Sequence, residues 1–383
     1  MEQAVAGQLK VVIATKLNVG IKHVSLPVAY IPGDTDEFIL LSGHYDSWHK
    51  GATDNAGSNA LCLELARVFS NYLGKLKRGI KIAWWPGHSN KRYAGSAWYC
   101  DHFWQDLNDN CVAHINVDFS GSNGAVKIIS KSTTMEDQDL LKKIISDFTG
   151  KETNTFDYLP CGVDQSFLGV SIPIHLAIRY ESEDKSIIYN PGGGWWWHTE
   201  EDLYDKIDLE LLLRDTKIHA AIIQNISQAD VLPLKLTQFL KNSKKILEEI
   251  DKNSDEAFDF TPIYQSLEGF REKWNEVEKR NTVPLEVYNQ LLKIIAGDLN
   301  RLMFSYSSEY DFDSTFPKKP FPGLQKVEHI YKPSASKESY LFTMTFFVRQ
   351  RNRFINEMKM MINIINNFMQ YKNSLYPVPK SLQ

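Results

Sequence analysis

The chain has 383 residues, 43% of them hydrophobic and 23% charged, which is ordinary for a soluble globular protein of two or three domains. Its formal net charge of −4 provides no basic surface for nucleic acid, so we expect no nucleic-acid partner. No apolar run approaches the roughly 18 residues that span a bilayer, and no signal peptide is visible, so we also expect no membrane partner.

Strand and helix patterns alternate along the first 228 residues. The expected strands are Leu9–Thr15, His23–Ile31, Glu37–His44, Gly79–Trp85, Val112–Phe119, Ala125–Ser130 and Ser171–Ile178. The expected helices are Gly57–Leu73, Gly95–Phe103, Met135–Phe148 and Leu209–Ile226. Several strands are apolar throughout, which is typical of strands covered on both faces. The alternation therefore predicts an α/β fold, a three-layer α/β/α sandwich around a mostly parallel mixed sheet.

The composition changes near residues 229–233, and beyond that point strand signals are scarce. The expected helices there are Leu236–Ile250, Tyr264–Arg280, Leu285–Leu302 and Tyr340–Tyr371. We therefore predict two domains, residues 1–228 and a helical domain of residues 229–383. An apolar stripe on the last helix indicates either bundle core alone or core combined with a homodimer interface, and it comprises Phe346, Phe347, Phe354, Met358, Met361, Ile362, Ile365 and Met369.

Histidine and carboxylate side chains follow the ends of several predicted strands. His44 and Asp46 form an H-x-D pair at the end of an apolar strand, and Asp54 lies in the turn before the next helix. Asp118 ends the strand HINVDF, and His198 precedes a helix. Ligands bind at the carboxyl ends of strands in open α/β sheets, and hydrolytic metal sites take such ligands from several strand ends. One polar residue at a strand end means little, but the recurrence predicts a metal site.

Four motifs in this order, GHYDS, GATDNAGS, VDFSG and HTEED, resemble the zinc-dependent aminopeptidases and carboxypeptidases of peptidase family M28. The likeness covers residues 1 to about 228 and implies a zinc-exopeptidase fold, which the transferrin receptor, glutamate carboxypeptidase and glutaminyl cyclases share. It implies one or two zinc ions and a small peptide or peptide-like substrate. The C-terminal helices also resemble the dimerisation domain of the transferrin-receptor branch, which implies a homodimer.

The resemblance also assigns roles to the five ionisable residues. His44 is a ligand of one metal, and the carboxylate of Asp46 orients His44. Asp54 bridges both metals. Asp118 completes the ligand set of the first metal, and His198 belongs to the second.

The chain departs from the family pattern after the strand GIKIAWW. Family members usually carry two adjacent glutamates there, a general base and a ligand of the second metal, but this chain has His88 and Ser89. No acid lies anywhere in Lys81–Cys100. Three alternatives follow. His88 is the general base; or His88 is a metal ligand and the base is Glu200 or Glu201; or the second site is empty and the protein is mononuclear or inactive.

Other residues are candidates for substrate binding or support. Asp164 matches a supporting position of the family pattern. Arg92 and Tyr93 adjoin His88, where a cation would hold a substrate carboxylate, although an ordinary loop charge explains Arg92 equally well. Arg179 is a second candidate anchor. Trp197 ends the run GGGWWW and forms either an apolar wall over the metals or part of the core.

The sequence thus predicts a metal-dependent hydrolase that cleaves an amide bond, with an aminopeptidase as the default. The alternatives are a non-catalytic binding or interaction protein on the M28 scaffold, and a cyclotransferase or deacylase. We expect a cytoplasmic location because the cysteines show no CxxC spacing and lie in apolar segments, as buried reduced thiols do; they are Cys62, Cys100, Cys111 and Cys161.

Overall fold

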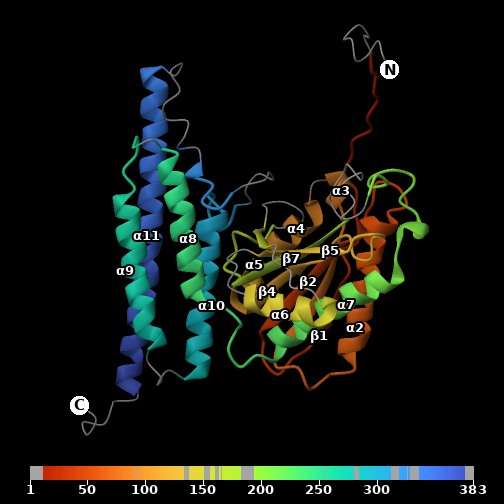
Figure 1. The fold of residues 1–383 in the computed structure, drawn as a ribbon, viewed down its shortest axis with the longest axis horizontal. Coiled ribbons are helices and arrows are strands. Elements are labelled where there is room, and N and C mark those ends of the chain that lie inside the picture. The colour runs from red at the N-terminus through yellow and green to blue at the C-terminus, as the bar shows by residue number, and fades with distance from the viewer. Residues whose placement is uncertain are drawn as a thin grey trace.

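The centre of the fold is a seven-stranded sheet with the strand order β1-β3-β2-β4-β7-β5-β6 (Figure 1). This computed structural model describes residues 12–91, 93–132, 138–150, 156–159, 164, 166–182, 194–254, 256–279, 284–311, 319–325, 327 and 336–375. The strands are β1 (Val28–Ile31), β2 (Phe38–His44), β3 (Gly79–Trp85), β4 (Cys111–Asn116), β5 (Lys127–Ser132), β6 (Phe156–Tyr158) and β7 (Ile174–Glu181). Neighbouring strands are parallel except for the pairs β1–β3 and β5–β7.

Helices cover both faces of the sheet. The helical segments of this region are η1 (Ala52–Ala56), α2 (Gly57–Ser70), α3 (His88–Lys91), α4 (Ala94–His102), α5 (Trp104–Asn110), α6 (Gln138–Thr149), η2 (Tyr204–Lys206) and α7 (Leu209–Gln228). Side chains alternate along β2, so that Ile39 and Leu41 join the core under α2, α6 and α7. Phe38 and Leu40 join a second core under α4 and α5. The expected three-layer sandwich with a mostly parallel mixed sheet is confirmed.

The N-terminal strand that the sequence predicted is absent from the described residues. Residues 12–27 have no regular secondary structure, and β1 begins only at Val28. Val12 and Ile13 are 94% and 81% exposed, so their β propensity meets no neighbouring strand on which to pack. The predicted strand Leu9–Thr15 is therefore wrong for residues 12–15, and residues 9–11 lie outside the described residues.

Four helices follow the sheet region: α8 (Leu236–Lys252), α9 (Thr261–Glu278), α10 (Leu285–Phe304) and α11 (Lys337–Leu375). Figure 1 shows them gathered beside the sheet, with α10 nearest to it. The helical C-terminal region is thus confirmed, while its status as a separate domain from residue 229 stays a prediction. None of the helices in the described part of the chain is both long and apolar enough to cross a membrane.

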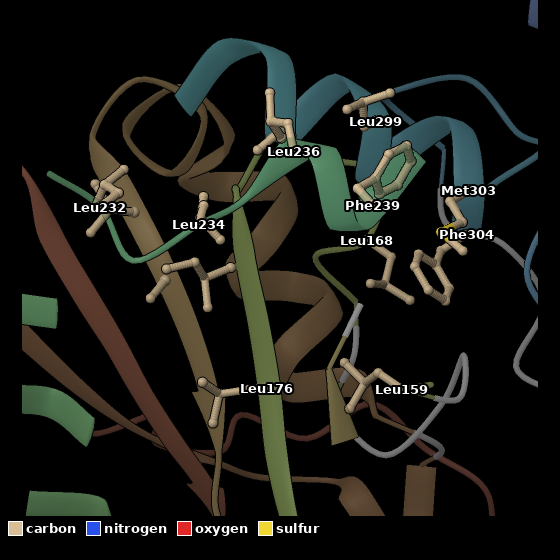
Figure 2. Close-up of a cluster of buried hydrophobic side chains, with 14 of the residues drawn as sticks. Leu159, Leu168, Leu176, Leu232, Leu234, Leu236, Phe239, Leu299, Met303 and Phe304 are labelled. Carbon is tan, nitrogen blue, oxygen red and sulfur yellow. The ribbon is translucent and has the colours of Figure 1, made fainter. Parts of the chain in front are cut away.

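The helical region and the sheet share one hydrophobic core. Figure 2 shows side chains of α10, of α8 and of the segment just before α8 packed against side chains of the sheet region. The labelled residues are Leu159, Leu168, Leu176, Leu232, Leu234, Leu236, Phe239, Leu299, Met303 and Phe304. Asn300 of α10 also donates hydrogen bonds to the carbonyls of Ile172 at 2.9 Å and Pro173 at 2.8 Å. Apolar packing and these buried polar contacts together fix α10 against the sheet region.

Most of the apolar stripe on α11 is buried within the chain itself. The fully buried members are Phe347, Phe354, Met358, Met361 and Ile365. Phe346 remains 41% exposed. The stripe therefore supplies core packing, and the expected homodimer stays a prediction.

Candidate metal centre

Parallel pairing of β2 and β4 brings a histidine and a carboxylate together. Ser42 of β2 lies opposite Asn116 of β4. His44 is two residues beyond Ser42, at the last position of β2, and Asp118 is two residues beyond Asn116. The two side chains consequently reach the same level at the carboxyl edge of the sheet.

The neighbouring strand β3 adds a second histidine. β3 ends at Trp85, opposite His44, and the following Gly87 has φ +75°, a left-handed conformation that turns the chain into α3 at His88. One nitrogen each of His44 and His88 and one carboxylate oxygen of Asp118 lie within 4.8 Å of one another. Three adjacent strands therefore contribute one side chain each to a single site.

Asp54, on η1, lies in the middle of the site, and its inner side faces His44. His44 Nε2 lies 3.0 Å from Asp54 Oδ1 and 3.6 Å from Asp118 Oδ1. The three side chains are 1%, 6% and 12% exposed, respectively. We call this group of His44, Asp54 and Asp118 the inner set.

The inner set has the electrostatics of a cation site. Burial by itself would lower the pKa of His44, but the carboxylates of Asp118 and Asp54 raise it well above its ordinary value. Burial also raises the pKa of Asp118. His44 Nε2, Asp54 Oδ1 and Asp118 Oδ1 are buried without a hydrogen-bond partner. His44 Nε2 thus lies between two carboxylate oxygens, and zinc takes nitrogen and oxygen donors of these kinds.

The outer side of Asp54 is more open and less complete. His198 Nε2 lies 3.0 Å from Asp54 Oδ2, and the His198 side chain is 36% exposed. Trp197 donates its indole N–H to the same oxygen at 2.9 Å and stacks on the His198 ring at 3.9 Å. Asp54 thus faces a histidine with each oxygen, as the expected bridging role requires, but the outer oxygen already accepts a hydrogen bond from Trp197. Trp197 therefore binds the Asp54 carboxylate. Neither of the two roles expected from the sequence, an apolar wall over the metals or a part of the core, includes this contact.

Asp46 lies at the site but contacts it differently from the expectation. His44 Nδ1 donates to the main-chain carbonyl of Asp46 at 2.8 Å, whereas the nearest Asp46 carboxylate oxygen is 4.0 Å away. The carboxylate instead accepts the backbone N–H groups of His88 and Ser89, both at 3.0 Å. Asp46 therefore orients His44 through its backbone and fixes the His88-Ser89 turn through its side chain.

His88 is held by a carboxylate of its own. Its Nδ1 donates to Asp164 Oδ2 at 2.6 Å, and the Asp164 side chain is fully buried. Ser96 donates to the other Asp164 oxygen at 2.9 Å and lies 2.9 Å from the Ser166 hydroxyl. Tyr93 packs its ring edgewise on His88, with centroids 4.9 Å apart. These contacts fix the imidazole with a proton on Nδ1 and leave Nε2 as an acceptor.

Ring stacking distinguishes the roles of the two histidines. The His44 and His88 rings are parallel within 9°, with centroids 3.8 Å apart. The lone pair of an imidazole nitrogen lies in the ring plane, so one ion cannot lie in both planes. The geometry therefore favours His88 as a proton acceptor over His88 as a ligand.

The remaining predicted substrate residues are less closely tied to the centre. Tyr93 is buried against His88. Arg179 forms an ion pair with Glu181 at 2.8 Å, and no contact among the described residues joins Arg179 to the inner set. Arg92 lies outside the described residues.

A buried acid that sequence reasoning did not single out organises the Asp54 turn. Asp202, 2% exposed, accepts the Thr53 N–H and hydroxyl at 2.8 Å each and the Asp54 N–H at 3.1 Å. Asp202 belongs to the motif HTEED, but its partners are some 150 positions away, so no local pattern indicates them. It holds the loop that presents Asp54 to both histidines.

Residues 28–223 match the model of Peptidase family M28. Among curated proteins, "Aminopeptidase NAALADL1" from Mus musculus is 34% identical over 91 residues, 23% of this chain and 12% of that protein. "Probable glutamate carboxypeptidase VP8" from Zea mays is 27% identical over 127 residues, 30% of this chain and 18% of that protein. The matched stretch thus covers less than a fifth of the length of either relative.

Solved structures with a related arrangement include an aminopeptidase from Aneurinibacillus sp. strain AM-1, with a TM-score of 0.44 and 24% identity over 52% of this chain and 47% of that one. A glutaminyl cyclase from Bacteroides thetaiotaomicron has a TM-score of 0.41 and 17% identity over 52% of this chain and 77% of that one.

Proposed function

Because the chain belongs to peptidase family M28, we propose that it is a zinc-dependent hydrolase of amide bonds in small peptides, with an aminopeptidase as the preferred type. The observation that carries the proposal is His88, which is held by Asp164 and stacked on His44 beside the inner set. This arrangement supplies a proton acceptor where the family's usual glutamate is missing.

The proposed ligands of a single zinc ion are His44, Asp54 and Asp118. Three protein ligands with a further open position are typical of catalytic zinc. A zinc ion bound there supplies Lewis acidity, which polarises a substrate carbonyl and lowers the pKa of a water. The outer side offers His198 and the second oxygen of Asp54, but no carboxylate among the described residues replaces the missing glutamate. We therefore propose one ion rather than two.

In the proposed mechanism, His88 Nε2 accepts a proton from the attacking water as the water oxygen bonds to the carbonyl carbon. The same nitrogen returns the proton to the leaving nitrogen as the carbon–nitrogen bond breaks. Asp164 stabilises the imidazolium that exists between these two transfers, because its carboxylate accepts the Nδ1 proton at 2.6 Å. Asp46 keeps the turn that carries His88 in place.

A substrate panel tests the reaction type. The zinc-loaded chain would be offered dipeptide amides with a free N-terminus, the same peptides N-acetylated, and glutaminyl peptides able to cyclise. The proposal predicts turnover of the free peptides. Turnover confined to acetylated peptides would indicate a deacylase, cyclisation alone a cyclotransferase, and no turnover with tightly bound zinc a non-catalytic relative. The first result supports the proposal, and each of the others contradicts it.

Three expectations about the whole protein remain predictions: the cytoplasmic location, the homodimer formed through the C-terminal helices, and the domain boundary at residue 229. Size-exclusion chromatography with light scattering tests the homodimer directly, because a dimer doubles the measured mass.

A further inference from the structure

A second cavity lies away from the metal centre, where α10 meets α5. It has a volume of about 290 Å³ and is lined by Trp104, Asn108, Ser171, Lys293, Ile294, Asp298, Arg301 and Glu309. This volume is at the lower end of the range for small-molecule sites, roughly 300–1,000 Å³. No lining residue belongs to the inner set or contacts it through an interaction described above, so the cavity requires its own explanation.

The walls of this cavity are rigidly held. Gly297 of α10 packs so closely on Ser171 that a Cβ at this position would lie 2.4 Å from the Ser171 carbonyl oxygen. On the other side, the Trp104 indole donates to the Glu309 carbonyl at 3.0 Å. Together with the Asn300 hydrogen bonds, these contacts make the cavity a preformed space between packed elements, which favours ligand binding.

One end of the cavity holds a buried ammonium group that forms no direct ion pair among the residues that the structure describes. Lys293 is 8% exposed, and its Nζ donates to the backbone carbonyl of Asp109 at the end of α5. No carboxylate lies within ion-pair distance of it among the residues that the structure describes. Burial lowers the pKa of Lys293, since removing a charge from water is costly, and the charges of Glu37 and Asp109 offset this only in part. The Asp109 carbonyl is the one acceptor that contacts this group among the described residues, and an ammonium group carries three N–H donors.

The other end of the cavity has an excess of negative charge. Around the single guanidinium of Arg301 lie the carboxylates of Asp298 at 3.6 Å, Glu357 at 3.4 Å and Glu309 in direct contact. Ser171 donates to Asp298 Oδ1 at 3.0 Å. Burial raises the pKa of Asp298, which is consistent with an incompletely compensated carboxylate.

We propose that this cavity binds a zwitterionic α-amino acid, with its carboxylate on Lys293 and its ammonium group on Asp298 and Glu309. Lys293 and Asp298 are five positions apart on α10, which corresponds to about 7.5 Å along the helix axis. An amino acid has its two charges roughly 3 Å apart, and a hydrogen bond of about 2.8 Å at each end gives a span of the same order. The ligand matches the charges in sign, and its length is of the same order as the separation of Lys293 and Asp298 along the helix axis. The proposal concerns binding alone and does not depend on the proposed hydrolase activity.

Isothermal titration calorimetry with three small probes tests the proposal. L-Alanine carries both charges, propionate lacks the ammonium group, and ethylammonium lacks the carboxylate. Titrations would use the full chain and its His44→Ala variant, which removes amino-acid binding at the metal centre. We expect one alanine per chain in the His44→Ala variant and at least that one in the wild type, and in the variant we expect the two single-charge probes to bind more weakly by about tenfold or more.

Two cavity variants and one control locate the site. Lys293→Met keeps the apolar stem without the charge, and Asp298→Asn keeps the shape. Each should weaken alanine binding by about tenfold or more, whereas Lys244→Met, at an exposed lysine of α8, should not change it. Ligand-free Lys293→Met should melt no lower than the wild type, because the variant removes a buried uncompensated charge.

The proposal is overturned if alanine does not bind, if propionate binds as tightly as alanine, or if both cavity variants bind alanine like the wild type. Because the titrations are repeated in the His44→Ala background, failure here is distinguishable from failure of the proposed hydrolase.

Discussion

The two oxygens of Asp54 face two very different environments. Its Oδ1 lies in the inner set with His44, whose side chain is 1% exposed, and Asp118, which is 12% exposed. Its Oδ2 faces His198, which is 36% exposed, and accepts a hydrogen bond from Trp197. One side is supplied by adjacent parallel strands, whereas the other is supplied by a loop.

This difference indicates where the chain has kept the chemistry of a metal site and where it has changed it. The inner set combines buried carboxylates with a histidine, and without a cation those charges would be costly. The outer side has no third protein ligand in the part of the chain that the structure describes, and Ser89 occupies the position where the family usually has a glutamate. The nearby His88 has a buried carboxylate partner in Asp164. These differences support the proposal that the inner side binds the ion and that His88 transfers the proton.

The largest expected effect is that of breaking the inner set. His44→Ala or Asp54→Ala should remove bound zinc and reduce kcat/KM by about 10⁴-fold or more, because ligand and Lewis acid are lost together. Elemental analysis and peptidase assays on the same preparations measure both quantities. His102→Ala, at an exposed histidine of α4, is the control and should retain both. Substantial turnover in zinc-free His44→Ala would contradict the assignment.

The next effect separates proton transfer from metal binding. His88→Ala should reduce kcat by roughly 10²–10⁴-fold, the usual contribution of a general base, while zinc content stays at the wild-type level. Loss of zinc in this variant would instead identify His88 as a ligand. Normal hydrolysis would exclude it from either role.

Asp164→Asn should have a smaller effect, about 10–100-fold on kcat, as expected for a residue that orients a functional histidine. The asparagine amide can donate to His88 Nδ1 and so move the ring proton to Nε2, where it blocks proton acceptance. KM should change little. In the His88→Ala background the same substitution should have no further effect on kcat, and an additive loss would show that Asp164 acts only on stability.

The smallest effect on activity is expected at the outer side. Ser89→Glu returns a carboxylate to the turn that Asp46 holds, and it should raise the zinc content from one toward two ions per chain while changing kcat only a few-fold. Ser89→Gln, which has the same length but no charge, is the matched control and should stay at one ion. A second ion already bound in the wild type would contradict the proposed difference between the inner and outer sides of Asp54.

Much of this centre could be predicted from local sequence signals. His44, Asp46 and Asp118 follow apolar strands, and parallel pairing of those strands brings their ends together. The contacts between these side chains were harder to predict from the sequence. The pairing of His88 with Asp164 joins positions 76 apart, and nothing in the PGHSN turn specifies a distant carboxylate.

The remaining differences have a similar physical origin. Residues 12–15 have strand-like composition, but a strand also needs a neighbouring strand, and none of the described strands pairs with them. Asp46 was expected to orient His44 with its carboxylate, yet the two backbone N–H groups of the following turn take that carboxylate. Which donors the Asp46 carboxylate binds depends on three-dimensional packing rather than on spacing along the chain.

The central claim, that the inner set binds a single catalytic ion, is tested most directly by counting and locating the metal. Purified wild-type protein would be analysed for zinc per chain, and a crystal would be measured on both sides of the zinc absorption edge. We predict one ion per chain and one anomalous peak, bounded by His44, Asp54 and Asp118. Two peaks of equal height, a peak on His198 alone, or no bound metal would contradict the claim.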